Sequence, residues 1–369
     1  MKTVCRKNQC VGCKECISIC AKGAIKIIDS VKYYNAIIDE NKCIGCNLCI
    51  EHCQNNHIIP LIKPIGWYQG WTNDEKLRLN SSSGGYAASI EYGFINSGGY
   101  VCSCVFEHGT FSFKLTNNIQ DISKFSGSKY VKSDPGDIYK KVLSLIKRKN
   151  KVLFVGLPCQ VAAIKDYVGE PNPKLLYTID LVCHGSPSPQ LLNDFLKEKN
   201  ITLSNLASIS FREKGTYCVK PDGVLCSAFG MVDRYSLGFL CSIFNTENCY
   251  NCKYADIRRI GDLTLGDSWG SELPINEQKK GISLALYQTP KGKELLENSN
   301  LTLLSVNLQN AILNNQQLRE PCKQTNKWEK FFYLYDGKFN KRVFQCLKWK
   351  CIKQEIKRIL ANLQIFFKL

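Results

Sequence analysis

The sequence has no long hydrophobic run and few acidic residues for its size. No stretch of about 18 uninterrupted apolar residues occurs among the 369 residues, so we expect no segment that spans a bilayer. The first residues, MKTVCRKNQCVGC, contain no apolar stretch of the kind found in secretory signals, which leads us to expect a cytoplasmic protein. No helix-turn-helix or base-stacking motif is present, and we therefore expect no nucleic-acid partner.

The charge balance is strongly basic. Lysine and arginine total 49 against 32 for aspartate and glutamate, which gives a formal net charge of +17. Such a surplus favours an acidic partner protein, an anionic substrate or an anionic membrane surface. Hydrophobic residues make up 44% of the chain and aromatic residues 11%, which suffices for a packed core, and the length suits a small domain followed by larger ones.

The chain contains 21 cysteines, and nine of them fall within the first 53 residues. Clustering of this kind in a chain of this length indicates metal ligation in a reducing compartment rather than a disulfide scaffold. Two quartets repeat one spacing, CVGCKECISIC at 10–20 and CIGCNLCIEHC at 43–53. The stretch AIKIIDSVKYYNAIID between them predicts two short strands around a turn.

The repeated C-x2-C-x2-C-x3-C spacing resembles that of bacterial dicluster ferredoxins over about sixty residues. In that family the fourth cysteine of each run ligates the other 4Fe-4S cluster. The resemblance implies that one cluster is held by Cys10, Cys13, Cys16 and Cys53, and the other by Cys20, Cys43, Cys46 and Cys49. Ala21 and Gln54 stand where the family usually has proline, which removes no ligand. Two zinc sites are the alternative, although zinc sites seldom use this quartet twice. We expect the remaining Cys5 to be unligated.

Beyond residue 66, two segments each predict a strand, a turn and a helix. VLFVGLPCQVAAIKDY places a strand at 152–155 before Cys159, and LYTIDLVCHGSPSPQLL places one at 177–182 before Cys183. Units in this order predict a parallel sheet that binds ligands at the carboxyl ends of its strands. Cys249 and Cys252 follow in NCYNC, but spacing alone favours small buried hydrophobic residues over ligands at all four cysteines.

Six motifs in order closely resemble the beta subunit of coenzyme F420 hydrogenase/dehydrogenase: SSSGG, GSKYVKS, VLFVGLPCQVAAIK, DLVCHGSPSPQLL, SFREKG and CYNCKYADIRRIGDLTLGDSWG. The resemblance runs from about residue 67 to about residue 300, and relatives include flavoproteins that combine FAD with an iron–sulfur cluster. It implies an FAD and a third 4Fe-4S cluster, the latter held by Cys159, Cys183, Cys249 and Cys252. The other cysteines match no ligand position of the family, and Cys241 is the substitute if Cys159 is not a ligand.

The same resemblance implies residues that bind the flavin. A glycine turn that opens a helix offers an anion site, and here it consists of Ser82, Ser83, Gly84 and Gly85. Without the resemblance, this motif is a plain loop. Lys129 is a candidate for contact with the flavin ring or its phosphates, and the alternative is a solvated surface lysine.

The chemistry is expected at residues near the third cluster. His184 follows Cys183 and is a candidate proton donor near the flavin, or else a structural hydrogen-bonding group. Asp262, Asp267 and Trp269 are expected to shape the floor of the site. Leu157 and Ser268 differ from the residues that the family usually has at these positions. The resemblance therefore does not identify the substrate.

These features together predict an iron–sulfur flavoprotein oxidoreductase. It would pass electrons between a ferredoxin-like partner and an organic two-electron substrate, either the deazaflavin F420 or a polysaccharide-precursor type of substrate, through 4Fe-4S clusters and FAD. The alternative is a non-catalytic electron-transfer subunit of a larger redox complex. An iron–sulfur sensor that binds nucleic acid through a basic tail is disfavoured because no recognition motif is present.

We expect an α+β fold in three parts. These are a dicluster ferredoxin domain at 1–60, an α/β flavin-binding domain with a mostly parallel sheet at 66–320, and a basic helical tail at 323–369. Residues 349–369 have a helical period, with one apolar side formed by Ile352, Ile356, Ile359, Leu360, Leu363, Phe366 and Phe367. The tail is expected either to pack on the core or to lie on the inner face of a membrane as a peripheral helix.

Overall fold

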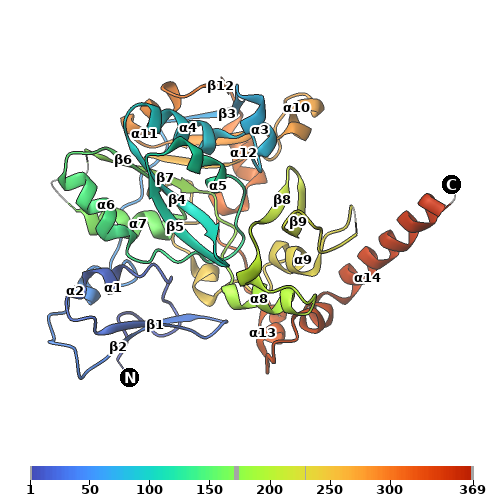
Figure 1. Ribbon diagram of the computed structural model, residues 1–369, viewed down its shortest axis with the longest axis horizontal. Coiled ribbons are helices and arrows are strands. Elements are labelled where there is room, and N and C mark those ends of the chain that lie inside the picture. Colours follow the sequence, from blue (N-terminus) through green and yellow to red (C-terminus); the bar gives the residue numbers. More distant parts are fainter. Residues whose placement is uncertain (1, 170–173, 229, 367–369) are drawn as a thin grey trace.

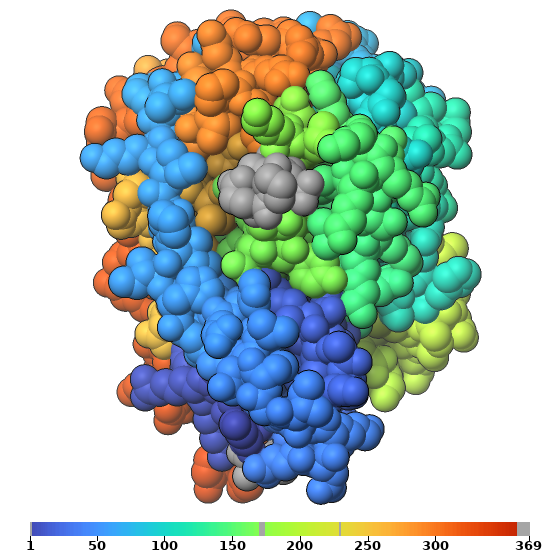
Figure 2. All heavy atoms as spheres, turned by 90° about the vertical axis from the view of Figure 1, so that its left-hand side faces the viewer, coloured from blue at the N-terminus to red at the C-terminus, as the bar shows by residue number. Residues whose placement is uncertain are grey.

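The computed structural model describes residues 2–169, 174–228 and 230–366. Its N-terminal segment contains the short helices α1 (Glu15–Ile19) and α2 (Leu48–Glu51) and a hairpin of β1 (Ile25–Asp29) with β2 (Tyr34–Ile38). The β-branched residues of the intervening stretch thus form the two strands predicted for it. Figure 2 shows this segment, in dark blue, packed against the green helices, with the chain that follows it continuing up the surface in lighter blue.

The two cysteine quartets repeat in backbone conformation as well as in spacing. Gly12 and Gly45 occupy equivalent positions, with φ angles of +71° and +72°. Lys14 and Asn47, which precede α1 and α2, have φ angles of 61° and 60°. This left-handed conformation is readily available to glycine, which explains why each quartet carries a glycine directly before its second cysteine.

The described residues form a central sheet of eight strands in the order β12-β3-β11-β10-β7-β6-β4-β5 (Figure 1). The strands are β3 (Gly66–Thr72), β4 (Tyr100–Glu107), β5 (Thr110–Thr116), β6 (Val152–Gly156), β7 (Leu176–Leu181), β10 (Leu263–Asp267), β11 (Ser283–Tyr287) and β12 (Leu301–Leu304). The central strands β4, β6, β7 and β10 run parallel, and β3 shares their direction. The predicted mostly parallel sheet is confirmed, with antiparallel strands added at both edges and at β11.

Helices cover both faces of this sheet. Along β6, Val152 and Phe154 join the cluster beneath α6 (Ile138–Lys147) and α7 (Pro158–Val168). Leu153 and Val155 point the other way, because successive strand residues alternate between faces. On that second face lie α4 (Tyr86–Asn96), α5 (Ile122–Phe125) and α11 (Pro290–Glu297). Burial on both faces explains why this strand is apolar throughout.

A third region packs beside the sheet around a cluster of aromatic residues. Its elements are α8 (Pro189–Lys197), the hairpin of β8 (Ile209–Glu213) and β9 (Thr216–Pro221), α9 (Arg234–Leu240), α13 (Asn326–Phe332) and α14 (Phe339–Phe366). Tyr235, Phe244 and Phe339 are fully buried at its centre. The remaining helices are α3 (Glu75–Asn80), α10 (Ile275–Lys280) and α12 (Leu308–Asn314), with short 3-10 turns at Ile119–Asp121, Leu203–Asn205, Glu247–Asn251 and Gln316–Leu318.

The C-terminal helix α14 divides into a packed part and a projecting part. Val343, Cys346, Leu347 and Cys351 are buried in the aromatic cluster, and the backbone of Leu347 is not helical. Figure 1 shows the rest of the helix extending away from the body. The side chains of Leu360, Leu363, Phe366 and Phe367 lie outside the described part of the chain. Among the described residues, none of the helices has the length and apolar content that crossing a membrane requires.

The predicted fold class is confirmed, with a ferredoxin-like N-terminal segment, a mostly parallel sheet covered by helices and a C-terminal helix. The predicted domain limits stay a prediction. Trp328 and Phe331, which lie in the segment predicted as a tail, are fully buried against the rest of the protein. The basic composition begins near residue 323, but the residues just after this position still pack against the rest of the protein.

Candidate functional site

Four predicted cluster ligands lie around one cavity. Cys159 is in the first turn of α7, Cys183 follows β7, and Cys249 and Cys252 lie in and just after the 3-10 turn Glu247–Asn251. Strands β6 and β7 are adjacent and parallel, so their carboxyl ends bring the first two cysteines to the same edge of the sheet. All four residues line a cavity of about 90 Å³, which we call the cysteine cavity.

The electrostatics of the cysteine cavity reflect four thiols held close together. Burial raises the pKa of Cys159 to about 12, and the charges of Cys252 and Cys249 add to the effect. Burial likewise raises the pKa of Cys183, again with contributions from Cys249 and Cys159. Thiols with these pKa values ionise readily only when a cation or a metal stabilises the thiolates. The site therefore suits a group that supplies positive charge, as a cluster core does.

Lys132, which the sequence analysis overlooked, faces these thiols. Burial works to lower the pKa of Lys132, but the negative charges of Cys249, Cys159 and Cys183 raise it overall. Its ammonium also donates to the backbone oxygen of Val11, 3.1 Å away in the first cysteine quartet. Lys132 thus connects the cysteine cavity to the N-terminal segment. The motif GSKYVKS, which contains it, was a signal that could have identified it.

A fifth cysteine of this cavity is Cys322, for which the sequence analysis found no role. Its sulfur accepts a hydrogen bond from the amide of Asn245 at 3.5 Å. Cys241, which the sequence analysis named as a substitute ligand, is not among the residues that line the cavity, and Lys350 donates to its sulfur at 3.0 Å. If one predicted ligand fails, Cys322 is therefore the better substitute.

A larger cavity of about 340 Å³ adjoins the cysteine cavity. It is lined by Ser82, Ser83 and Gly85 just before α4, by Lys129, by Asp267 at the end of β10, and by Trp269 just after it. The two cavities share the wall residues Leu157, Cys183, His184, Gly185, Ser186 and Gln317. The predicted flavin-binding residues and the predicted cluster ligands therefore meet at one continuous site.

Gly84 supports the larger cavity without lining it. A β-carbon at this position would lie 2.3 Å from the backbone oxygen of Gly70 and 2.6 Å from the backbone nitrogen of Ser283. Only glycine allows the loop to approach β3 and β11 this closely. Gly85 then caps α4 with a φ angle of +87°, and Gly85, Tyr86 and Ala87 at this helix N-terminus all line the cavity.

Lys129 is held in place by backbone oxygens rather than solvated freely at the surface. Its ammonium donates to the carbonyls of Lys124, Phe125 and Ser126 at 3.3, 2.6 and 3.1 Å. Burial lowers its pKa. A positive charge fixed in a low-dielectric wall attracts an anionic ligand more strongly than a mobile surface charge does.

His184 has a partner at each ring nitrogen. The amide nitrogen of Gln317 can only donate, so the histidine Nδ1, at 3.1 Å, accepts. The proton of the neutral ring is then on Nε2, which lies 2.9 Å from the hydroxyl of Ser242. Burial lowers the pKa of His184 and so favours this neutral form. The ring is therefore oriented in one tautomer at the wall between the two cavities.

The far wall of the larger cavity carries a fixed guanidinium group. Arg212 donates to both carboxylate oxygens of Asp267, at 2.6 and 3.0 Å, and its guanidinium lies 5.2 Å from the ring centres of both Tyr217 and Trp269. Asp267 and Trp269 thus line the larger cavity, and their expected role at the floor of the site stays a prediction. Asp262 does not line the cavity, because its carboxylate accepts from the backbone and hydroxyl groups of Thr178 on β7.

The larger cavity also contains a buried acid, Glu91 on α4. Burial raises the pKa of Glu91 from 4.5 to about 8, against weaker lowering effects of Ser103 and Lys129. In the folded protein this carboxyl group therefore keeps its proton over a pH range in which the unfolded chain loses it.

This acid makes stability depend on pH. Because its folded pKa is raised, the stabilisation that it gives is complete below pH 4.5 and is lost as the pH rises toward about 8. Between about pH 6 and 8, we expect the thermal midpoint of the parent protein to fall relative to that of Glu91→Gln, which cannot ionise. Glu75→Gln, on the exposed face of α3, is the control and should follow the parent. Parallel curves for the parent and Glu91→Gln would contradict this prediction.

In the N-terminal segment, several of the predicted ligand cysteines influence one another's pKa. Burial raises the pKa of Cys49, and the charges of Cys20, Cys43 and Cys46 raise it further. Around the other predicted quartet, Cys5 lies within hydrogen-bonding distance of Cys10 and Cys53, whose hydrogen bonds lower its pKa. The expectation that Cys5 is unligated stays a prediction, but the residue is a close neighbour of that quartet.

Comparison with known families agrees with this arrangement. Residues 9–57 match the 4Fe-4S dicluster domain. Residues 149–305 match the family described as the C terminus of the beta subunit of coenzyme F420 hydrogenase/dehydrogenase. Each of the two matches covers less than half of the chain. The predicted family resemblance and the 4Fe-4S dicluster are thereby confirmed.

The chain is similar to one in a xenon-derivatised structure of the F420-reducing [NiFe] hydrogenase complex from Methanosarcina barkeri, with 17% identity, a TM-score of 0.49 and coverage of 75% of this chain and 96% of that chain. Similarity at this level supports no conclusion about function. None of the curated proteins matches this chain. The individual ligand sets, a third cluster and FAD stay predictions.

Proposed function

We propose that this protein, in which residues 149–305 match the C terminus of the coenzyme F420 hydrogenase/dehydrogenase beta subunit, is an iron–sulfur flavoprotein oxidoreductase. It would transfer electrons between a ferredoxin-like partner and an organic two-electron substrate. The observation that carries the proposal is the shared wall of the two cavities, where Cys183 and His184 border both. A cluster in one cavity and a flavin in the other would be neighbours, as efficient electron transfer requires.

The residues present fit both groups. Cys159, Cys183, Cys249 and Cys252 offer four thiolates to a third cluster, and Lys132 balances part of their charge. The larger cavity falls within the volume range of small-molecule sites, about 300–1,000 Å³, and offers a helix N-terminus and Lys129 to an anionic pyrophosphate. When bound, FAD would convert between one-electron and two-electron chemistry.

His184 and Lys129 are the residues proposed to act at the reacting centre. His184 holds a proton at Nε2 in an orientation fixed by Gln317, beside the predicted flavin cavity. Lys129 places a fixed positive charge where negative charge on a bound ring or phosphate would need stabilisation. Leu157 and the aromatic rings of Tyr217 and Trp269 line the same space.

The substrate is proposed to be either the deazaflavin F420 or a polysaccharide-precursor type of molecule. Arg212 and the aromatic rings beside it favour a planar or anionic group over a neutral aliphatic one. The fixed Arg212–Asp267 pair leaves less of the arginine's charge for a ligand than a free arginine would offer.

Anaerobic purification followed by metal, sulfide and flavin analysis tests the proposal. We expect about twelve irons and about twelve acid-labile sulfides per chain, together with one extractable FAD. Zinc in place of iron would refute the cluster assignments, and a chain with clusters but no flavin would refute the flavoprotein. Oxidation or reduction of a small molecule by the purified chain alone would separate an enzyme from a non-catalytic electron-transfer subunit.

We further propose that the projecting part of α14 binds an anionic membrane surface. Ile356 and Ile359 are about half exposed, at 52% and 53%, and basic residues lie on the same segment. Deleting residues 353–369 should therefore abolish binding to anionic liposomes while the iron content stays unchanged. Added salt should weaken the binding of the full chain, because it screens attraction to lipid headgroups.

The packing of α14 determines where such a deletion must begin. Cys346, Leu347 and Cys351 are buried, so a deletion that starts at 346 would remove part of the core and is expected to destabilise the protein. The 353–369 deletion avoids this damage. Full liposome binding by that shorter chain would show that α14 is not the membrane-binding element.

A further inference from the structure

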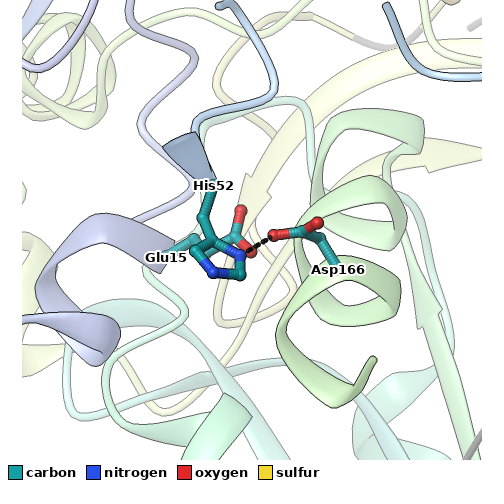
Figure 3. Close-up of side chains that lie close together, drawn as sticks. All are labelled: Glu15, His52 and Asp166. Atoms are coloured by element: carbon teal, nitrogen blue, oxygen red, sulfur yellow. Dashed lines mark hydrogen bonds and ion pairs between the residues drawn. The ribbon is translucent and has the colours of Figure 1, made fainter. Parts of the chain in front are cut away.

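Three metal-ligating side chains meet where the N-terminal segment contacts the α/β domain. Glu15 is the first residue of α1, His52 caps the end of α2, and Asp166 lies on α7. One ligand atom from each lies within 4.8 Å of the others. Figure 3 shows the three side chains pointing toward one another from their separate helices.

The carboxylate of Glu15 is buried without a partner. The residue is 2% exposed, and neither of its carboxylate oxygens has a hydrogen-bond partner. Within the described part of the chain, no ion pair joins Glu15 or Asp166 to a lysine or an arginine. An uncompensated buried charge is strongly unfavourable, and here two carboxylates face each other. A proton held by Glu15 or a bound cation would remove this repulsion.

The geometry points to a site for a divalent first-row transition cation, bound by Glu15, His52 and Asp166. Two carboxylates and one imidazole are ligands that such ions accept, and the imidazole disfavours magnesium and calcium, which prefer oxygen ligands. The Nδ1 atom of His52 and an Oδ atom of Asp166 are 2.7 Å apart. Adjacent ligands around an ion with bonds of about 2.1 Å are separated by roughly 3 Å, so the spacing of this pair is close to that of two ligands of one ion.

The exposure of the three residues also suits a metal site. The side chains of His52 and Asp166 are 41% and 33% exposed, whereas Glu15 is buried behind them. An ion can therefore enter from solvent, and water can complete its coordination. Bound there, it would tie α1 and α2 to α7, the helix whose first turn contains Cys159. The site would hold two cluster-bearing parts of the protein in a fixed relation.

Stoichiometry gives the first test, with the anaerobically purified holoprotein. Each 4Fe-4S cluster contains equal numbers of iron and sulfide, so an additional mononuclear ion appears as one iron without sulfide, or as one equivalent of zinc, manganese or cobalt. If the isolated protein carries none, Mn²⁺ alone is titrated into the holoprotein with its clusters in the oxidised, diamagnetic state. Electron paramagnetic resonance should then show one bound Mn²⁺ per chain.

Substitution gives the second test. Glu15→Gln and Asp166→Asn keep the shape of the side chains but remove their charge, and each should weaken Mn²⁺ binding by more than about tenfold without loss of cluster iron. Asp137→Asn is the matched control, since this exposed residue of the same domain pairs only with Lys141 at 2.9 Å among the described residues. It should bind Mn²⁺ as the parent does.

A third measurement needs no variant. Electron spin echo modulation of Mn²⁺ in the parent protein should reveal coupling to an imidazole nitrogen, because His52 is a proposed ligand. Absence of that coupling would overturn the site. So would a holoprotein with equal iron and sulfide, no other metal, and Mn²⁺ binding that Glu15→Gln leaves unchanged.

Discussion

Replacing Cys252 with serine should lower the iron content of the anaerobically purified protein by about one cluster, from roughly twelve irons per chain toward eight. Cys252 lines the cysteine cavity with Cys159, Cys183 and Cys249, and the proposed third cluster needs all four thiolates. A serine oxygen is a poorer ligand for iron than a thiolate. Cys183→Ser should have the same effect, because Cys183 is another proposed ligand of the cluster. It lies in a different segment from Cys252.

The flavin provides an independent readout in the same variants. The proposed flavin residues Ser82, Ser83 and Lys129 lie on other elements, so FAD should remain bound. It should no longer be reduced by the N-terminal clusters, because the proposed link between them is missing. Reduced ferredoxin is added, and the loss of flavin absorbance is followed over time.

Cys322 supplies the matched control. It lines the same cavity, yet its sulfur already accepts a hydrogen bond from Asn245. Cys322→Ser should keep full iron and normal flavin reduction. Full iron and normal flavin reduction in Cys252→Ser would instead contradict the assignment of Cys252 as a ligand, and loss of iron in Cys322→Ser would place that residue in the ligand set.

The parts of this arrangement that repeat along the chain could be predicted from the sequence. The two quartets share spacing, and the structure gives Gly12 and Gly45 nearly the same φ angle. The strand–turn–helix units around Cys159 and Cys183 are also local patterns, so the parallel pairing of β6 and β7 followed from them.

What could not be predicted depends on contacts between distant segments. Strand β3 lies between β11 and β12, which come more than 200 residues later, and no local pattern shows such a pairing. Lys132 and Cys322 reach the cysteine cavity from segments with no ligand spacing of their own. Glu15 belongs to no pattern that predicts its burial, and only the fold shows that it is buried. The sequence therefore identified most proposed ligands, whereas their charged and buried neighbours required the fold.

The adjacent arginines 258 and 259 should respond very differently to substitution. Arg259 is 1% exposed and donates to Asp180, which is fully buried on β7, from Nε at 2.9 Å and from Nη2 at 2.6 Å. It also donates to the backbone oxygen of Tyr254 at 2.7 Å, and so anchors the segment that follows Cys252. Arg258 makes its ion pair with Asp256 at the surface, with half of its side chain exposed.

Arg259→Met keeps much of the side-chain volume but removes the cation that pairs with Asp180. The buried Asp180 carboxylate then keeps its hydrogen bond from the backbone amide of Gly261, at 2.8 Å, but has no positive charge beside it. Breaking a buried pair in this way typically costs about 3–5 kcal/mol of stability. We therefore expect a large fall in the thermal midpoint, measured at one heating rate because cluster loss makes unfolding irreversible. Arg258→Met should leave the midpoint unchanged, because exposed pairs contribute little.

Adding Asp180→Asn to Arg259→Met should recover part of the loss, since no unpaired charge then remains in the core. Equal midpoints for the two single variants would show that the Asp180–Arg259 pair does not hold the cysteine-bearing segment against the sheet.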